Sequence, residues 1–343
     1  MRARAPLFAC ALALLALNVR AAEPAVYAAP QDRRGEEQTF LTFPEWFLVF
    51  SPAEYAQYVR GHTPDGFPFW GHIGQLWRAY GGVIRETTSR HEPTNWGYHV
   101  MIVVISVSTT VEYAVRSAYE TTFGRISAAL AGGNTPEDAY GAKAAQQYVD
   151  FIRLRPWYEF DFWARLHGLW TQTDLWGPHP LRKWERKYAL TTEYTVKALY
   201  GWMITRATHT AYDTPLESTS VVARDWSRCD VQRAHFRVLQ PISDSRALLA
   251  LPRYAPFTDS ALALAQCGAE FEEIAVNRTV ILTSVLGPLG RTPPLGLPVM
   301  TRQPIITQPG VERLVLVVPL DRLGSLLRDL EPAGLTLEHV FDY

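Results

Sequence analysis

The amino-acid sequence predicts an α+β fold, with a mainly helical N-terminal domain followed by a ferredoxin-like (βαββαβ) C-terminal domain. Three helix-start motifs lie in the N-terminal half, whereas short apolar runs alternate with helix-like segments after His235. The chain contains 11 tryptophans, of which Trp46 is the first and Trp226 the last. So sharp a change of composition indicates a domain boundary, which we expect near residues 213–234.

Composition limits the classes of protein to which the chain can belong. At 343 residues with 48% hydrophobic side chains, it is long enough for one large or two ordinary domains with hydrophobic cores, and disorder is excluded. The formal net charge is -1, which gives no electrostatic attraction to nucleic acid. We therefore predict no nucleic-acid partner.

The start of the chain has the pattern of a secretory signal. Arg2 and Arg4 precede an apolar run over residues 6–19, and small residues follow it. The run is shorter than the ~20 residues that a membrane-spanning helix needs. We predict a signal peptide or N-terminal membrane anchor over residues 1–22, and hence a protein of the bacterial cell envelope, either anchored in the inner membrane or periplasmic. A polar, Pro/Ala-rich linker is expected over residues 23–38.

The cysteines suggest no scaffold and no metal site. Cys10 leaves with the signal if the signal is cleaved, so Cys229 and Cys267 are then the only pair in an oxidising compartment. One disulfide and two free buried thiols are equally compatible with the sequence. Because the chain has no Cys-x-x-Cys motif, we predict neither a redox dithiol nor a thiolate zinc site.

Residues 39–225 are predicted to form a Trp-rich helical domain, for which membrane association is one of the expected alternatives. Three motifs place a proline and an acidic residue after a hydroxyl residue, as in a capping box, where the hydroxyl caps free amides and the carboxylate reaches back. The motifs are Thr42-Phe43-Pro44-Glu45, Ser51-Pro52-Ala53-Glu54 and Thr135-Pro136-Glu137-Asp138. Helices are also expected over residues 139–170, with a break before Pro156, and over residues 193–212.

Residues 98–111 are the most apolar stretch after the signal. We expect a buried or membrane-embedded helix that continues to about Ser127. A buried strand is an alternative, because many of these residues are β-branched. A true membrane span is a second alternative, although the run is shorter than a span requires.

Residues 232–343 are predicted to form the ferredoxin-like domain. Apolar alternation and turn residues predict strands over residues 235–242, 270–275, 279–286, 311–319 and 335–341. Helices are expected over residues 257–267 and 320–330, and Gly268 ends the first of them. Residues 287–309 are expected to form a Pro/Gly-rich loop. We interpret this succession as the split βαββαβ pattern. The pattern supports no specific function, since many functions share it.

The densest polar and aromatic region, residues 155–187, holds the candidate site. If Glu159, His167, Asp174 and His179 surround a pocket, they supply acids, bases or metal ligands. The alternative, which we favour, is that the carboxylates pair with nearby arginines and that the tryptophans fill a core or an interfacial belt. The arginines in question are Arg155, Arg165 and Arg182. No standard catalytic, phosphate-binding or dinucleotide-binding motif occurs, and we predict no cofactor and no metal.

Four stretches resemble a family of uncharacterised bacterial membrane or envelope proteins. They are Leu41-Thr42-Phe43-Pro44-Glu45-Trp46, Trp96-Gly97-Tyr98-His99, Arg155-Pro156-Trp157-Tyr158-Glu159-Phe160 and Leu175-Trp176-Gly177-Pro178-His179-Pro180. The resemblance implies location only, because the family has no assigned activity, and it carries over no catalytic residue.

Two functions are compatible with these patterns. The first is a non-enzymatic, membrane-associated envelope protein with a structural or interaction role, for which membrane lipid is the expected partner. The second is an enzyme or carrier that acts on a lipid or other apolar small molecule in a Trp-lined pocket. The sequence names no protein partner, substrate or oligomeric state.

Overall fold

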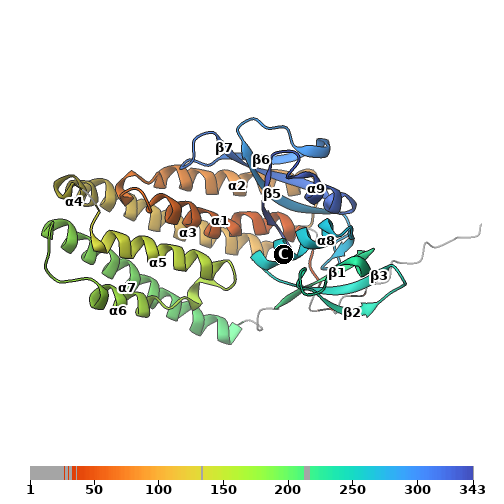
Figure 1. Cartoon of the computed structure of the whole chain (residues 1–343), viewed down its shortest axis with the longest axis horizontal. Coiled ribbons are helices and arrows are strands. Elements are labelled where there is room, and N and C mark those ends of the chain that lie inside the picture. The colour runs from red at the N-terminus through yellow and green to blue at the C-terminus, as the bar shows by residue number, and fades with distance from the viewer. Residues whose placement is uncertain are drawn as a thin grey trace, which may run out of the picture.

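The computed structural model describes residues 27, 30, 33–35, 37–132, 134–211 and 217–342, with the side chains of residues 207–211 excepted. The predicted signal or anchor over residues 1–22 lies outside these residues, as does most of the predicted linker. The described chain is α+β. Long helices run side by side at one end, and the strands gather at the other end (Figure 1).

The N-terminal part is helical, as predicted. Its helices are α1 (Gln38–Tyr58), α2 (Phe69–Ser89), α3 (Trp96–Tyr119), α4 (Arg125–Ala131), α5 (Pro136–Ile152), α6 (Phe162–Gln172) and α7 (Pro180–Ala211). Residues 98–111 lie in α3, so the apolar run is a helix rather than a strand. A π-helical turn over Glu120–Gly124 continues α3 into α4. The predicted break at Pro156 is confirmed, because it lies between α5 and α6.

Two of the three predicted helix starts are wrong, because α1 continues through both Pro44 and Pro52. The hydroxyl of Thr42 donates to Gln38 O, 2.8 Å away, and Ser51 Oγ bonds to side chains of α2 and α3. Neither hydroxyl caps a helix. Most of α1 is buried, so tertiary packing outweighs the backbone hydrogen bonds that the two prolines remove.

The third predicted start is confirmed at α5. Thr135 Oγ1 accepts a hydrogen bond from Asp138 N, and the Asp138 carboxylate accepts one from Thr135 N at 2.9 Å. This capping box satisfies two amides that the helix cannot satisfy itself.

The C-terminal part holds two antiparallel sheets of four strands each among the described residues. The elements are β1 (Ser218–Arg224), β2 (Arg237–Pro241), β3 (Arg246–Pro252), α8 (Ala255–Gln266), β4 (Glu270–Ile274), β5 (Val280–Pro288), β6 (Val299–Pro304), β7 (Val311–Pro319), α9 (Leu323–Asp329) and β8 (Thr336–Val340). The change from helix to strand falls between Ala211 and Ser218. The strand β1 therefore lies inside the range 39–225 for which we expected helices.

The two sheets are tandem copies of one topology. The strand orders are β2-β3-β1-β4 and β6-β7-β5-β8, and each unit has a helix before its last strand. The irregularities also match: β1 shifts register against β4 after Val222, and β5 shifts against β8 after Ser284. Superposing these registers aligns β3 with β7, so that Arg246 corresponds to Arg313 and Pro252 to Pro319.

A ferredoxin-like topology is not confirmed. The expected strands 235–242 and 270–275 belong to the first sheet, whereas 279–286, 311–319 and 335–341 belong to the second. The range 232–343, which we predicted as one ferredoxin-like domain, therefore combines part of the first strand unit with the second. We also missed three strands, namely β1, β3 and β6.

Of the four apolar clusters in the described chain, two pack helices against the sheets. One packs α8 and α9 against both sheets and includes Phe257, Phe271 and Leu326. The other packs α1, α2 and α3 against the outer face of the second sheet, where Phe43 meets Phe341 edge-on at 5.7 Å. The helical and strand parts therefore share buried surface. A domain boundary near residues 213–234 stays a prediction.

One cross-link ties the first strand unit together. A disulfide joins Cys229 to Cys267, with a Cα–Cα distance of 5.4 Å. Gly268 follows with a φ of 98°, in the region that favours glycine, and it ends α8 as the sequence predicted.

Candidate functional site

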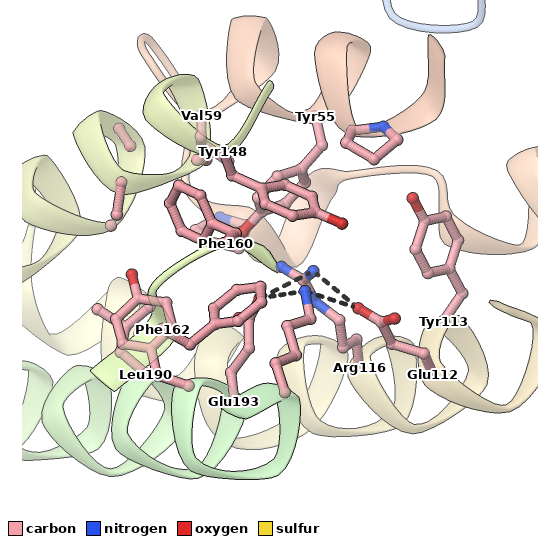
Figure 2. Close-up of a pocket in the computed structure, with 18 of the residues that line it drawn as sticks. Tyr55, Val59, Glu112, Tyr113, Arg116, Tyr148, Phe160, Phe162, Leu190 and Glu193 are labelled. Atoms are coloured by element: carbon pink, nitrogen blue, oxygen red, sulfur yellow. Dashed lines mark hydrogen bonds and ion pairs between the residues drawn. The ribbon is translucent and has the colours of Figure 1, made fainter. Parts of the chain in front are cut away.

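A cleft opens within the helical bundle between α1, α3, α5 and α7 (Figure 2). Its empty volume is about 1030 Å³, the open mouth included. Four tyrosines and three phenylalanines form much of its wall, and these are Tyr55, Tyr113, Tyr148, Tyr194, Phe47, Phe160 and Phe162. The described lining contains tyrosine and phenylalanine but no tryptophan, so the expected Trp-lined pocket is not the cleft that forms.

Four ionisable side chains form the floor of the cleft. Glu112 and Arg116 lie four residues apart on α3, and Glu193 and Lys197 lie four residues apart on α7. This spacing places each pair on one helix face. Lys197 Nζ lies 2.8 Å from Glu193 Oε1 and 3.0 Å from Glu112 Oε1, so it joins the two helices. Figure 2 shows Arg116 directed between Glu112 and Glu193.

The aromatic wall supports these cations. The Arg116 guanidinium lies 4.4 Å from the centre of the Tyr55 ring, and Lys197 Nζ lies 5.5 Å from that of Tyr148. Such cation–π contacts stabilise a charge that has lost part of its water.

Electrostatics keep the α7 pair charged at neutral pH. Burial raises the pKa of Glu193, but Arg116 and Lys197 lower it more, and the net pKa is about 2. Burial lowers the pKa of Lys197, but Glu112 and Glu193 raise it more, so it stays above its usual value. A general acid or base works best with a pKa near the working pH. This pair is therefore suited to binding rather than to proton transfer.

A second set of buried charges braces the bundle beside the cleft. Arg182 pairs with Asp138 at 2.6 Å, Lys183 with Glu137 at 2.6 Å, and Arg186 with Glu120 at 2.9 Å. Lys187 Nζ donates to Thr173 O at 3.2 Å, and so holds the end of α6. Every one of these cations is almost fully buried. Buried charges persist only when they are paired in this way, so the set is structural.

A buried polar chain leads from the cleft to the second sheet. The Tyr113 hydroxyl bonds Ser51 Oγ at 2.7 Å, Ser51 Oγ bonds His72 Nδ1 at 2.8 Å, and His72 Nε2 lies 3.6 Å from Glu54 Oε2. Arg313 Nη2 donates to Glu54 Oε1 at 3.2 Å. The chain is enclosed by protein, because His72 is fully buried and Glu54 nearly so.

Burial sets the protonation of this chain. It raises the pKa of Glu54 to about 7, although Arg313 pulls the pKa down. Burial and, to a smaller extent, the charge of Arg313 together lower the pKa of His72 to about 3. His72 is therefore neutral at pH 7, while Glu54 titrates there.

Apolar side chains form an exposed stripe on the outer face of α3. Val100, Val104, Val107, Val111 and Val115 recur every three or four residues and are 49–65% exposed. The continuous helix over Trp96–Ala131 contains an 18-residue window with a mean hydropathy of 1.4, so by length and composition it could cross a membrane. Only 22% of its most apolar window is buried.

Exposed apolar residues continue onto the neighbouring helices. Trp77 of α2 donates from Nε1 to Thr110 Oγ1 of α3 at 3.0 Å. The ring centre of Tyr188 of α7 lies 6.1 Å from the ring centre of Tyr119 of α3. The exposed apolar side chains of α2 and α7 include Trp70, Trp77, Ile84, Leu181, Tyr188, Val196, Leu199, Trp202 and Met203.

The four candidates drawn from the sequence lie outside the cleft. Glu159 is exposed in a short turn before α6, His167 is exposed on α6, and Asp174 and His179 are exposed in the loop before α7. None of them is among the residues that line the cleft. Of the expected pairings, Arg182 does bind a carboxylate, but its partners are Asp138 and Glu185. Within the described residues no group of three or more His, Cys, Asp or Glu side chains could hold a metal ion.

The residues that form the cleft floor carry a signal in the sequence that we did not use. Glu112-x-x-x-Arg116 and Glu193-x-x-x-Lys197 are opposite charges at helical spacing. The first pair lies in the largely apolar α3, whereas α7 carries several other charged residues. A charged pair in an apolar helix such as α3 must lie against other polar groups. The sequence could not show that the two pairs face each other, because they are far apart along the chain and only the folded bundle brings α3 to α7.

Comparison with known proteins assigns the chain to no family: no family model matches it, and neither a curated protein nor a solved structure does. The resemblance to bacterial envelope proteins therefore stays an expectation from the sequence.

Proposed function

We propose that this is a membrane-associated protein of the bacterial cell envelope with a non-enzymatic, structural or interaction role. The observation that carries the proposal is the exposed valine stripe of α3. Transfer of apolar surface out of water is favourable by roughly 25 cal/mol per Å², so this face gains free energy by contact with lipid.

The packing of α3 supports association by one face rather than an isolated span. The opposite side of the helix, which includes Ile102, Ser106 and Tyr113, is buried against the bundle. A helix that crosses a bilayer alone exposes every side to lipid. Exposed Arg78 and Arg85 lie among the apolar residues of α2, where their heads can reach lipid phosphates while their stems cover apolar surface.

Two further observations support the proposal. A disulfide such as Cys229–Cys267 persists in oxidising compartments, which include the bacterial periplasm. The fixed charges of Glu193 and Lys197 favour a role in binding over acid–base catalysis.

Vesicle flotation tests membrane association. We expect the purified full-length protein to float with phospholipid vesicles after a high-salt wash. The double variant Val104→Glu/Val111→Glu places two charges on the stripe without removing a polar contact, so it should remain at the bottom of the gradient.

The matched control is Val231→Glu/Leu239→Glu, which changes two exposed apolar residues of the strand part. It should float like the wild type. A wild-type protein that stays at the bottom, or a stripe variant that floats as well as the control, would refute the proposed association.

A further inference from the structure

We propose that the cleft binds one single-chain amphiphile with a zwitterionic head that carries a phosphate and an ammonium group. The head lies on the charged floor, and the chain lies along the aromatic wall. The proposed membrane association supplies the source of such a ligand, but the binding site itself rests on the cleft alone.

The first support is a set of hydrogen-bond donors that the protein does not use. Arg116 lines the cleft, and its guanidinium makes two ion pairs at 3.5 and 3.6 Å but no hydrogen bond to the described residues. A guanidinium presents five N–H groups in a planar fork that suits a phosphate. The hydroxyls of Tyr55 and Tyr148 also line the cleft and bond no described residue, although both rings are fixed by cations.

The second support is the charge balance of the floor. Arg116 and Lys197 carry two positive charges, and Glu112 and Glu193 carry two negative charges. Glu137, Asp138 and Arg186 also line the cleft, but each is paired with a buried residue outside this floor. An anion alone would leave the partly dehydrated floor with a net negative charge, and a cation alone would leave it positive. A zwitterion keeps the balance: its phosphate takes the free donors of Arg116, and its ammonium faces Glu112, whose side chain is 40% exposed.

The third support is the apolar wall of the cleft. Phe47, Val59, Ala144, Leu190 and Phe162 line the cleft beyond the charged floor. A polar floor and an apolar wall in one cleft match a ligand that has the same two parts.

Titration calorimetry on the full-length protein tests the inference. The probes share one acyl or alkyl chain length and stay below their micelle concentrations: a lysophosphatidylethanolamine, the free fatty acid and an alkyltrimethylammonium. Glycerophosphoethanolamine is the head without a chain. We expect one-to-one binding of the lysophospholipid, with the fatty acid and the alkylammonium at least tenfold weaker and the free head weaker still.

Variants locate the binding in the cleft. Arg116→Met should weaken the lysophospholipid at least about tenfold, because charge-assisted hydrogen bonds are lost. Arg85→Met, which removes an exposed guanidinium of α2 outside the cleft lining, should leave binding unchanged. Ala145→Trp narrows the cleft and leaves all four charges in place, so it should weaken every chain-bearing probe. Thermal melting confirms that each variant is folded.

The stripe variant Val104→Glu/Val111→Glu separates this inference from membrane association. It should lose flotation and keep one-to-one binding. The inference fails if the wild type does not bind the lysophospholipid, if the fatty acid or alkylammonium binds as tightly, or if the head alone accounts for the affinity. It also fails if folded Arg116→Met and Ala145→Trp bind like the wild type.

Discussion

Arg313 of β7 is the structural counterpart of Arg246 of β3, and each makes the same ion pair. Arg246 Nε donates to Glu272 Oε2 at 2.8 Å, and Arg313 Nε donates to Glu338 Oε2 at 2.5 Å. The two differ in their surroundings, because α1 and α2 cover the second sheet and leave the Arg313 side chain only 2% exposed against 39% for Arg246. One interaction is thus repeated in two environments.

This pair allows a direct test of how burial changes the value of an ion pair. Arg313→Met leaves the carboxylates of Glu54 and Glu338 without their cation in the interior, so we expect it to destabilise the protein by about 3–5 kcal/mol. Arg246→Met breaks a partly exposed pair and should cost about 1 kcal/mol or less. Urea unfolding at pH 7 measures both. Equal losses would show that the two sites are not distinguished by burial.

The strand repeat could have been found in the sequence. Arg246-Ala-Leu-Leu-Ala-Leu-Pro252 and Arg313-Leu-Val-Leu-Val-Val-Pro319 share their ends and their apolar run. Gly268 and Gly334, both with positive φ, lie between the helix that follows each run and the last strand of its unit. We recognised the second run as a strand and missed the first. Alanine and leucine also favour helices, so the first run carries a weaker strand signal than the valine-rich second run.

The sequence predicted the helical character of the N-terminal part better than it predicted where the helices begin or how they pack. The capping box at Thr135 was predicted correctly, because both of its hydrogen bonds join residues that are three apart in the sequence. The motifs at Thr42 and Ser51 failed, because the burial of α1 is decided by residues far away, such as Phe341 and Leu282. The cleft was missed for the same reason. Its floor depends on α3 facing α7, and no pattern within either helix specifies that packing.

The buried carboxylate of Glu54 predicts an unusual pH dependence. Its folded pKa of about 7 is above the ordinary value of 4.5, so the folded state holds this proton more tightly. The resulting stability is complete below about pH 4.5 and is lost as pH rises through 7. Relative to Glu54→Gln, the wild type should therefore lose up to about 3 kcal/mol of stability between pH 4.5 and pH 8.

Paired urea unfolding curves at pH 5 and pH 8 measure this difference. His72 acts in the opposite direction, because its pKa of about 3 makes the folded state lose stability as pH falls from 6.5 toward 3. The comparison of wild type with variant at each pH separates the contribution of Glu54 from that of His72. A difference that does not change with pH would contradict the raised pKa of Glu54.

The disulfide predicts a redox-dependent stability. Cys229 and Cys267 are 38 residues apart in the sequence, and a bridge over a loop of that length restricts the unfolded chain. Loop-closure entropy gives about 2–4 kcal/mol for such a bridge. Cys229→Ser/Cys267→Ser should lower stability by that amount under oxidising conditions. A reductant should lower the melting temperature of the wild type and leave that of the variant unchanged; equal responses would exclude a contribution from the bridge.

The loop before α7 provides a test of the candidate residues chosen from the sequence. His179 has a φ of 57°, a conformation that favours glycine, and it lies between Pro178 and Pro180. Its carbonyl oxygen accepts a hydrogen bond from Lys183 N at 3.0 Å. The contribution of His179 to the start of α7 therefore comes from its backbone and not from its exposed imidazole. His179→Gly should therefore be as stable as the wild type, and more stable than His179→Ala by about 1 kcal/mol.

Glu159→Gln is the companion test at an exposed carboxylate. We expect a change within about 0.5 kcal/mol, because no buried cation loses a partner. If His179 and Glu159 instead served a reaction, the Gly and Gln variants would be as abundant and as stable as the wild type yet fail to restore the phenotype of a deletion strain. Measuring melting temperature together with rescue separates the two cases. Full rescue by both variants is the expected result, since neither side chain reaches the cleft.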